Sequence, residues 1–309
     1  MPSNNRCRHA ADPSSPKRRA LLAFGLTVVA SSDAAATFEL RAVTGDNGDT
    51  TQRIVEALNQ RFPGLQSNAD VRALTARNGA AVYLALGPAA LKATIDTELN
   101  APLLSLFTSG EGYARLLGPA RTERKRLAVT AIYAEASPAN QMQLIRALYR
   151  RRVTVAVLVT DNTLYLEPMI HQAARAAGLD VDVQNVNAGE NVIRILNRLK
   201  ASSVLLTVPD PALYTPDTIR NVLESTYRRN QAVIGFSAAL VRAGTLAAAY
   251  STIEDTLAQV GDVVELLAAG RVPPPQYPLY WRVAFNENVA RSLNIVIDPS
   301  IRGLGNPAP

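Results

Sequence analysis

Short apolar runs alternate along the chain with longer amphipathic runs, and this alternation is the clearest pattern in the sequence. Amphipathic runs of helix length between apolar runs of strand length are typical of βαβ units, which form parallel sheets. Most of the apolar runs lack interleaved polar residues, as expected of strands covered on both faces. The sequence predicts an α/β fold with strands over Phe38–Val43, Ala80–Leu86, Leu103–Phe107, Leu127–Tyr133, Val153–Thr160, Val181–Val186, Val204–Val208, Ala232–Phe236, Leu246–Ala249 and Trp281–Phe285.

Three helices have clear starting signals. Ser137-Pro138 and Thr215-Pro216 each combine an N-cap residue with a proline at the first helical position. The segment Ser251-Thr252-Ile253-Glu254 fits a capping box and opens a long apolar stripe. We expect this third helix to end at Gly270, because the prolines at 273–275 prevent its resumption.

The segment Ile234–Thr252 joins a buried strand, a short helix, a second short strand and the capped start of the long helix. Its turn residues stand where the apolar runs stop. An open α/β sheet presents its ligand-facing groups at such positions. We therefore expect this segment to contribute to a binding site.

The N-terminus has the three parts of a signal peptide. A basic head ending in Arg18-Arg19 precedes an apolar run over Ala20–Ala30, and small residues follow at 33–36, before Thr37. The apolar run is too short for a membrane span, and a buried N-terminal helix is the alternative interpretation. Arg18-Arg19 also resembles a twin-arginine signal. Residues 1–36 are thus predicted to direct export, and a chain without disulfides exported in this way points to a bacterial periplasm.

Removing residues 1–36 also changes the composition. It takes away five of the 32 basic and two of the 26 acidic residues, so the formal net charge falls from +6 to +3, which does not favour nucleic-acid binding. The only cysteine, Cys7, and one of the two histidines, His9, lie in this segment. The remaining chain has no thiol for a disulfide or a nucleophile, and His171 is its single histidine.

Motifs of common catalytic and cofactor sites are missing from the sequence. It contains no phosphate-binding loop, no dinucleotide fingerprint after a strand, no zinc motif and no nucleophile elbow. His171 lies in a helix-like run and is interpreted as a surface or packing residue. We therefore predict no metal, no cofactor and no catalytic residue. Glu135, Asp161 and Asp210 each follow a strand-like run, where a carboxylate is either functional or a helix cap or turn former.

Aromatic residues also gather at the predicted strand ends. Tyr133, Tyr214, Phe236 and Tyr250 are placed where rings often wall a pocket, although any one ring alone is more often packing. Asp210 is flanked by prolines, so it either accepts hydrogen bonds from a cationic ligand group or opens a turn.

Several motifs in a fixed order resemble the substrate-binding-protein family of ABC transporters. They run between about Leu127 and Ile297 and are strongest around Ile234–Thr252. The matching segments are Val208-Pro209-Asp210-Pro211, Thr218-Ile219-Arg220, Thr226-Tyr227-Arg228, Ala232-Val233-Ile234-Gly235-Phe236-Ser237, Val241-Arg242-Ala243-Gly244, Tyr250-Ser251, Pro274-Pro275-Gln276-Tyr277-Pro278 and Val289-Ala290-Arg291-Ser292-Leu293, with Gln141 and residues 144–148 upstream.

This resemblance implies the type 1 periplasmic binding protein fold. Two Rossmann-like lobes with parallel sheets would be joined by three crossovers around a central ligand cleft. One lobe would comprise residues 37–134 and 250–271, and the other residues 135–249 and 272–309. The crossovers are expected at Ala134–Ser137, Thr245–Ser251 and Val272–Pro278.

The resemblance also implies a function. A monomeric protein would capture a small polar ligand, such as an amino acid, and deliver it to an ABC permease. By motif position, Asp210, Phe236, Ser237 and Tyr250 are expected in the pocket. With the other strand-end residues, the predicted ligand-binding set is Thr44, Gly87, Thr108, Ser109, Tyr133, Glu135, Asp161, Asp210, Phe236, Ser237 and Tyr250.

The sequence departs from similar sequences at two places. The segment after the first crossover strand reads Tyr133-Ala134-Glu135-Ala136-Ser137-Pro138 where similar sequences have Tyr-x-Asp-Gln-Pro, and the first loop, 44–49, lacks a bulky residue. A shifted or lost ligand is therefore one alternative. An accessory envelope or sensor protein of the same fold is a second, and an exported hydrolase using Glu135, Asp161 or Asp210 is a third.

Overall fold

The computed structural model describes residues 38–74, 81–97, 99–123, 128–199 and 201–309. The predicted signal peptide, residues 1–36, lies outside these ranges. Among the helices in the described ranges, none is both long enough and apolar enough to span a membrane.

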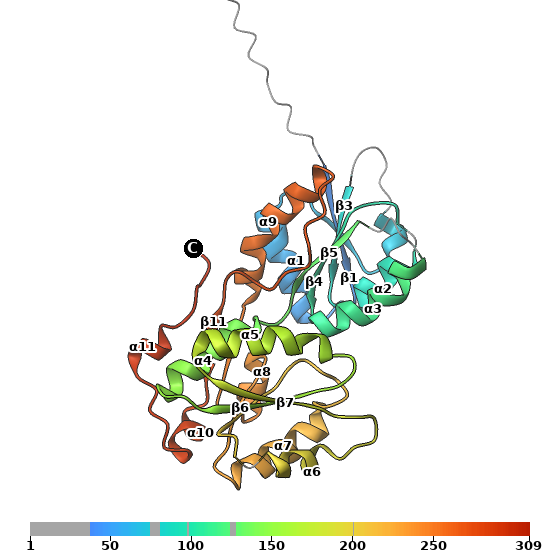
Figure 1. Cartoon of the computed structure of the whole chain (residues 1–309). Coiled ribbons are helices and arrows are strands. Elements are labelled where there is room, and N and C mark those ends of the chain that lie inside the picture. The colour runs from blue at the N-terminus through green and yellow to red at the C-terminus, as the bar shows by residue number, and fades with distance from the viewer. Residues whose placement is uncertain (1–37, 75–80, 98, 124–127, 200) are drawn as a thin grey trace, which may run out of the picture. The chain divides into compact units, whose positions relative to one another are not determined.

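The first sheet has five parallel strands in the order β2-β1-β3-β4-β5. They are β1 (Glu39–Thr44), β2 (Gln66–Asn68), β3 (Ala81–Leu86), β4 (Leu103–Thr108) and β5 (Val129–Tyr133). Helices α1 (Asp49–Arg61) and α9 (Ile253–Ala268) pack on one face. Helices α2 (Pro88–Asp96) and α3 (Gly110–Glu123), with the 3₁₀ turn Val71–Leu74, pack on the other (Figure 1).

The second sheet has six strands in the order β11-β10-β9-β8-β6-β7, and only β11 is antiparallel to its neighbour. The strands are β6 (Thr154–Val159), β7 (Asp180–Asn185), β8 (Val204–Leu206), β9 (Ala232–Ile234), β10 (Ala247–Tyr250) and β11 (Arg282–Phe285). Helices α4 (Pro138–Tyr149) and α5 (Glu167–Ala177) cover one face, and α6 (Val192–Arg198) and α7 (Pro216–Tyr227) cover the other. Short elements complete this lobe: the 3₁₀ turn Leu164–Leu166, α8 (Ala238–Ala243), α10 (Glu287–Ser292) and α11 (Pro299–Arg302).

The two sheets share one topology. Numbered by their order along the chain, the parallel strands of each sheet follow the order 2-1-3-4-5. In a sheet of this kind, ligands bind beyond the carboxyl ends of the strands, near the point where the strand order reverses. The fold therefore points to the loops after β1 and β3 in the first sheet and to the loops after β6 and β8 in the second.

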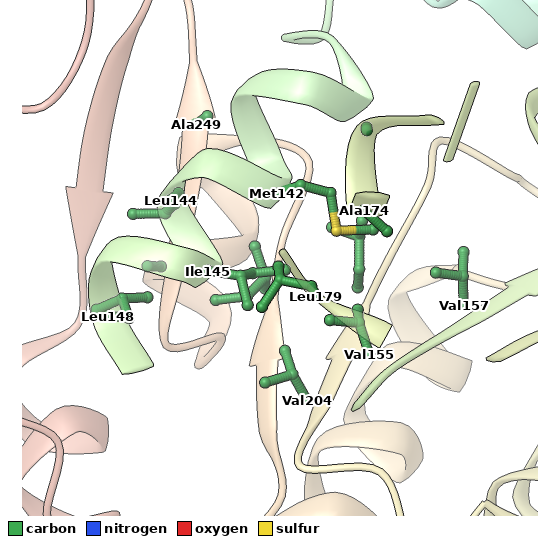
Figure 2. Close-up of a cluster of buried hydrophobic side chains, with 14 of the residues drawn as sticks. Met142, Leu144, Ile145, Leu148, Val155, Val157, Ala174, Leu179, Val204 and Ala249 are labelled. Atoms are coloured by element: carbon green, nitrogen blue, oxygen red, sulfur yellow. The ribbon is translucent and has the colours of Figure 1, made fainter. Parts of the chain in front are cut away.

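The core of the second lobe shows why its central strands, β6, β8, β9 and β10, are almost wholly apolar. In β6, Val155 and Val157 face the helices α4 and α5, whereas Ala156 and Leu158 face α6 and α7. Figure 2 shows Met142, Ile145 and Leu148 of α4 packed near Val155 and Val204 of the sheet. Because helices cover both faces, each of these central strands buries side chains in both directions.

The chain passes between the lobes three times, as predicted. It leaves β5 for α4, returns from β10 to α9, and leaves α9 again for β11. Glu135 in the first passage forms an isolated antiparallel bridge with Tyr250 in the second. In the third passage, Gln276 forms an isolated parallel bridge with Ile132 of β5. The chain is therefore still beside the first sheet when it reaches Gln276. The residue boundaries given for the lobes stay predictions.

All ten predicted strands are present, each within a few residues of its expected bounds, but three details differ. The polar, exposed strand β2 was not predicted, because its residues carry no apolar run. Strand β11 is antiparallel, so the second sheet is not wholly parallel. The third capping box is shifted by one residue: Thr252 is the N-cap and Asp255 its partner, because Ser251 donates its hydroxyl to the carbonyl of Tyr280 (2.6 Å).

Candidate ligand-binding site

A cleft of about 320 Å³ lies between residues of the two lobes, at the carboxyl ends of their strands. The first lobe contributes the loop after β3, the end of β4 and the first turns of α3. The second lobe contributes the loops after β8 and β9. The lining residues are Pro88, Phe107, Thr108, Ser109, Glu111, Gly112, Arg115, Pro209, Asp210, Pro211, Tyr214 and Phe236.

Phe107 has an unusual backbone in this cleft. Its φ of 58° lies in the left-handed region, which a bulky residue rarely adopts, and the pairing of β4 with β5 shifts register between Leu106 and Thr108. Strained residues of this kind cluster at ligand sites, where the surrounding fold holds them. No local pattern marked Phe107 as a site residue, because an aromatic residue at the end of an apolar run is typical of an ordinary core position.

Two hydroxyl groups in the cleft are buried without a hydrogen-bond partner in the described part of the chain. They are Oγ1 of Thr108 and the phenol oxygen of Tyr214. Burial, together with the nearby carboxylate of Asp210, raises the pKa of Tyr214, so its hydroxyl keeps its proton. Buried polar atoms are nearly always paired in folded proteins. These two atoms, one from each lobe, are therefore candidates for contact with a ligand.

Asp210 lies in the cleft lining but already has several partners. Its Oδ2 accepts hydrogen bonds from Thr160 (2.7 Å) and Thr163 (2.6 Å), and its Oδ1 accepts one from the backbone N–H of Ala212 (3.0 Å). Its carbonyl accepts from the N–H of Tyr214 (2.9 Å). Asp210 thus stabilises the turn that positions Tyr214. Of the two interpretations of Asp210, turn former and ligand acceptor, this arrangement favours the turn former.

Glu135 is the most strongly perturbed carboxyl group near the cleft. It is 7% exposed, and its Oε1 accepts a hydrogen bond from the N–H of Gly110, the first residue of α3 (2.9 Å). Its Oε2 is buried and has no partner in the described ranges. Burial raises the pKa of Glu135 to about 7; the Gly110 hydrogen bond acts in the opposite direction, and the carboxylate of Glu111 adds to the rise.

Beside Glu135 lies a second, smaller cavity of about 20 Å³, which we call the inner cavity. It is lined by Glu135, Ala136, Pro138, Gln141, Leu166, Ile170, Leu206, Thr207, Val208, Pro209, Phe236 and Tyr277. Pro209 and Phe236 line both the inner cavity and the cleft. The two spaces therefore adjoin, with the ring of Phe236 at their boundary.

The predicted site residues fall into several groups. Thr108, Ser109, Asp210 and Phe236 line the cleft, and Glu135 lines the inner cavity. Gly87 precedes the cleft residue Pro88 and has a φ of 88° that suits glycine, while its N–H donates to Leu106. Ser237 caps α8 by accepting from the N–H of Leu240 (3.3 Å).

Of the predicted aromatic residues, Tyr214 and Phe236 line the cleft, whereas Tyr133 and Tyr250 lie beside the crossovers. Tyr133 stacks edge-on against Tyr277, with ring centroids 5.1 Å apart. Tyr250 pairs with Glu135 through the backbone.

Gly87, Tyr133, Ser237 and Tyr250 are not among the residues that line the cleft or the inner cavity. Two other predicted residues line separate cavities. Thr44 lines a separate groove of about 560 Å³ at the ends of β1 and β2, with Asp46, Asn47 and Asn68 among its neighbours. Asp161 lines another cavity of about 290 Å³ and accepts a hydrogen bond from Asn185 (3.1 Å). Thr44 ends β1 and Asp161 follows β6, and these strands lie next to the edge strands β2 and β7. A position at the carboxyl end of a strand was therefore not enough to place either residue in the cleft.

Other cleft residues were missed by the sequence analysis. Glu111 is buried and receives a hydrogen bond from Arg115 (2.9 Å), four residues later on α3. The i, i+4 spacing could have suggested this pair, but nothing placed it in a cleft. Tyr165 and Tyr277 lie near Glu135 across the fold, and no local pattern signals such a contact. His171 is 40% exposed, as expected of a surface histidine.

No protein-family model matches the chain, and no curated protein matches it in sequence. Solved structures do match it. A substrate-binding protein with adhesive properties from Clostridium difficile, in its ligand-free, open form, has a TM-score of 0.59 at 14% identity, over 86% of this chain and 97% of that one. An ABC domain in complex with L-Trp from Streptococcus pneumonia has a TM-score of 0.53 at 16% identity, and a conserved domain protein from Vibrio cholerae has 0.55 at 16%, both over 86% of this chain and 97% of theirs.

These similarities, together with two α/β lobes of one topology and three crossovers, define the class of the protein by its fold. The chain has the type 1 periplasmic binding protein fold, as the sequence predicted. At these identities the likeness establishes the fold and leaves the ligand to be argued from the site.

Proposed function

We propose that this protein is an exported solute-binding protein that captures a small polar ligand between its lobes and delivers it to an ABC permease. The observation that carries the proposal is the cleft. Thr108 and Tyr214, from opposite lobes, each have a buried hydroxyl that finds no hydrogen-bond partner among the described residues. A ligand bonded to both would satisfy two groups that are costly to leave unpaired.

Such a ligand would also favour the arrangement of the lobes in which both hydroxyls reach it. Thr108 ends β4 in the first lobe, whereas Tyr214 follows β8 in the second. A ligand shifts a conformational equilibrium only through contacts that differ between the two states. Contacts that need both lobes differ in this way, and the three crossovers are the natural hinge.

Export, the permease partner and binding without catalysis are each supported by a different observation. Export to the periplasm rests on the sequence of residues 1–36, and the permease partner rests on the family resemblance and on the fold. Binding without catalysis is favoured because the acidic cleft residues are engaged: Glu111 with Arg115, and Asp210 with Thr160, Thr163 and Ala212. We propose a monomer that needs neither metal nor cofactor.

The proposal can be tested by a thermal-shift screen of amino acids, amines, sugars and nucleobases, followed by calorimetry of each hit. Binding should weaken about tenfold or more in the double variant T108V/Y214F, because each lost hydrogen bond contributes roughly 1 kcal/mol. The matched control is Y227F, since Tyr227 is 53% exposed on α7. Recovery of the ligand unchanged after incubation tests the absence of turnover. If no compound of any class binds the folded protein, the proposal fails.

A further inference from the structure

We propose that the ligand is a primary amine without a carboxylate group, held with its ammonium in the inner cavity against Glu135 and its apolar body in the cleft against Phe236. This inference rests on the proposed function and names the class of ligand for the same site.

The size and walls of the inner cavity fit an ammonium group. A volume of about 20 Å³ holds one group of the size of water, and an ammonium nitrogen is of that size. The walls are mainly apolar, and the amide of Gln141 is already bonded to the backbone of Ala249 (2.8 and 3.0 Å). Oε2 of Glu135 is the buried acceptor left without a partner among the described residues. Because an ammonium carries donors only, it is a suitable complement to this acceptor.

The groups around Glu135 also favour a cation. Tyr133, Tyr165 and Tyr277 lie near its carboxyl group, and Tyr277 lines the inner cavity. Aromatic rings attract cations through their negative faces. Glu111 is the nearby second carboxylate, and Arg115, the basic residue among the cleft-lining side chains, is paired with it.

The groups that would hold the carboxylate of an amino acid have other partners. The N-terminus of α3 is the natural anion site of the cleft, but the N–H of Gly110 donates to Glu135 and that of Gly112 to Oγ of Ser109 (3.1 Å). Arg115 donates to Glu111. A ligand carboxylate would have to displace these contacts and would lie near Glu111, so an amine should bind better than the corresponding amino acid.

The path between the two spaces passes Phe236. This residue and Pro209 are shared by the linings of the cleft and the inner cavity, and Phe107 lines the cleft from the other lobe. An amine on a short chain, attached to an aromatic or aliphatic body, would therefore place its head beyond Phe236 while its body stays among Phe107, Phe236 and Pro211.

The proposal has a consequence for pH. A cation binds the ionised form of Glu135, whose pKa burial raises to about 7 in the free protein. The groups facing it, Glu111, Tyr133, Tyr165 and Tyr277, are acids and do not supply a compensating charge. Binding at pH 6 must therefore release a proton, and affinity should rise about tenfold from pH 6 to pH 8 as the ionised fraction grows.

The test is calorimetric titration of the full protein with matched compounds: tryptamine, tyramine and phenethylamine against L-tryptophan, L-tyrosine and L-phenylalanine, with tryptophol as the neutral counterpart of tryptamine. We expect at least one amine to bind at least tenfold more tightly than its amino acid, with proton release at pH 6. E135Q should weaken amine binding at least tenfold and remove the pH dependence. E265Q, a change to an exposed carboxylate on α9, should alter neither.

The possible failures are distinguishable. If amino acids or neutral compounds bind as tightly as the amines, or if amine binding by the unmodified protein does not change with pH, the amine assignment is overturned while the solute-binding function stands. The pH measurement needs no variant, so it decides the matter even if E135Q does not fold. If no compound of any class binds, the proposed function fails and this inference falls with it.

Discussion

The carboxylate of Asp255 holds the guanidinium of Arg282 with both oxygens: Nε lies 2.8 Å from Oδ2, and Nη2 lies 3.0 Å from Oδ1. Asp255 is in the first turn of α9, which packs on the first sheet, whereas Arg282 begins β11 of the second sheet. Asp255 also accepts from the backbone N–H groups of Thr252 (3.2 Å) and Ala308 (2.9 Å). One fully buried side chain thus joins the start of a helix, the other lobe and the C-terminal segment.

Replacing Asp255 should destabilise the fold strongly. We expect D255N to lower the free energy of unfolding by about 1–3 kcal/mol, because it weakens the charge-assisted hydrogen bonds to Arg282 and the cap of α9. Urea denaturation at pH 7 measures this difference. D262N, at an exposed position on the same helix, should change the stability by less than about 0.5 kcal/mol. Equal effects of the two substitutions would contradict the structural role given to Asp255.

The same site predicts a response to acid. Burial alone would raise the pKa of Asp255, but the hydrogen bonds from Arg282, Ala308 and Thr252 outweigh burial and hold the pKa at about 2. A carboxyl group with a lowered pKa in the folded state adds stability above its unfolded value of 3.8, and this contribution is lost as the pH falls toward 2. The stability difference between the unmodified protein and D255N should therefore shrink between pH 4 and pH 2. A difference that stays constant over this range would count against the assignment.

Glu135 should respond to pH in the opposite direction. Its pKa rises from 4.5 to about 7 on folding, so its contribution to stability is full below pH 4.5 and is lost as the pH rises through 7. E135Q carries no such charge. Relative to the unmodified protein, it should gain on the order of 3 kcal/mol in unfolding free energy between pH 4.5 and pH 8. Denaturation curves of both proteins at several pH values, without added ligand, would show this gain, and parallel pH profiles would refute it.

Gln141 acts as a side-chain clamp on β10. Its Nε2 donates to the carbonyl of Ala249 (2.8 Å), and its Oε1 accepts from the N–H of the same residue (3.0 Å). Q141L would leave both buried backbone groups unpaired, and we expect a loss of about 2–4 kcal/mol in unfolding free energy. Faster amide hydrogen exchange at Ala249 would locate the effect. Q143L, at an exposed position of α4, is the control; an equally small effect of both changes would show that the clamp is dispensable.

Gly235 allows the close turn that leads from β9 to Phe236. A Cβ atom at this position would lie 2.8 Å from Cβ of Leu240 and 2.9 Å from Oγ1 of Thr245. G235A should therefore destabilise the protein by about 1–3 kcal/mol. G261A is the matched change: a Cβ at Gly261 meets nothing within 4 Å, and alanine favours the interior of α9 by about 1 kcal/mol. Thermal denaturation should shift the two variants in opposite directions, and a rise for G235A would contradict the close contact.

Much of the fold could be predicted from local patterns. The apolar runs located the central strands because helices cover both faces of each sheet, so nearly every residue of these strands is buried and apolar. The edge strands β7 and β11 also carry polar residues and were found from their valine and aromatic positions. Ser137-Pro138 and Thr215-Pro216 marked helix starts that the structure confirms with capping boxes. Strand β2 escaped, since its three residues are exposed and polar and its pairing with β1 is a backbone contact without an apolar signal.

The candidate site could be predicted only in part. The carboxyl ends of parallel strands share an edge, and this rule brought Thr108, Ser109, Asp210 and Phe236 to the cleft and Glu135 to its inner extension. The same rule placed Thr44 and Asp161 there as well, but the structure puts them in separate cavities. The rule identifies the edge of each sheet where a site can lie. It does not specify which loops at that edge face the other lobe.

The sequence alone determined most strands and the clearest helix starts, because periodicity, helix caps and apolar runs depend on residues close in the chain. Tertiary structure decided which segments form each lobe and gave Phe107 its positive φ. It also left Oε2 of Glu135 buried, with no hydrogen-bond partner among the described residues. Glu135 and Gly110 are 25 residues apart, and Asp255 and Arg282 are 27 apart. Burial and desolvation of a side chain depend on all the residues packed around it. The sequence therefore allows Glu135 to be a helix cap or a turn former, whereas in the folded protein it is a buried hydrogen-bond acceptor.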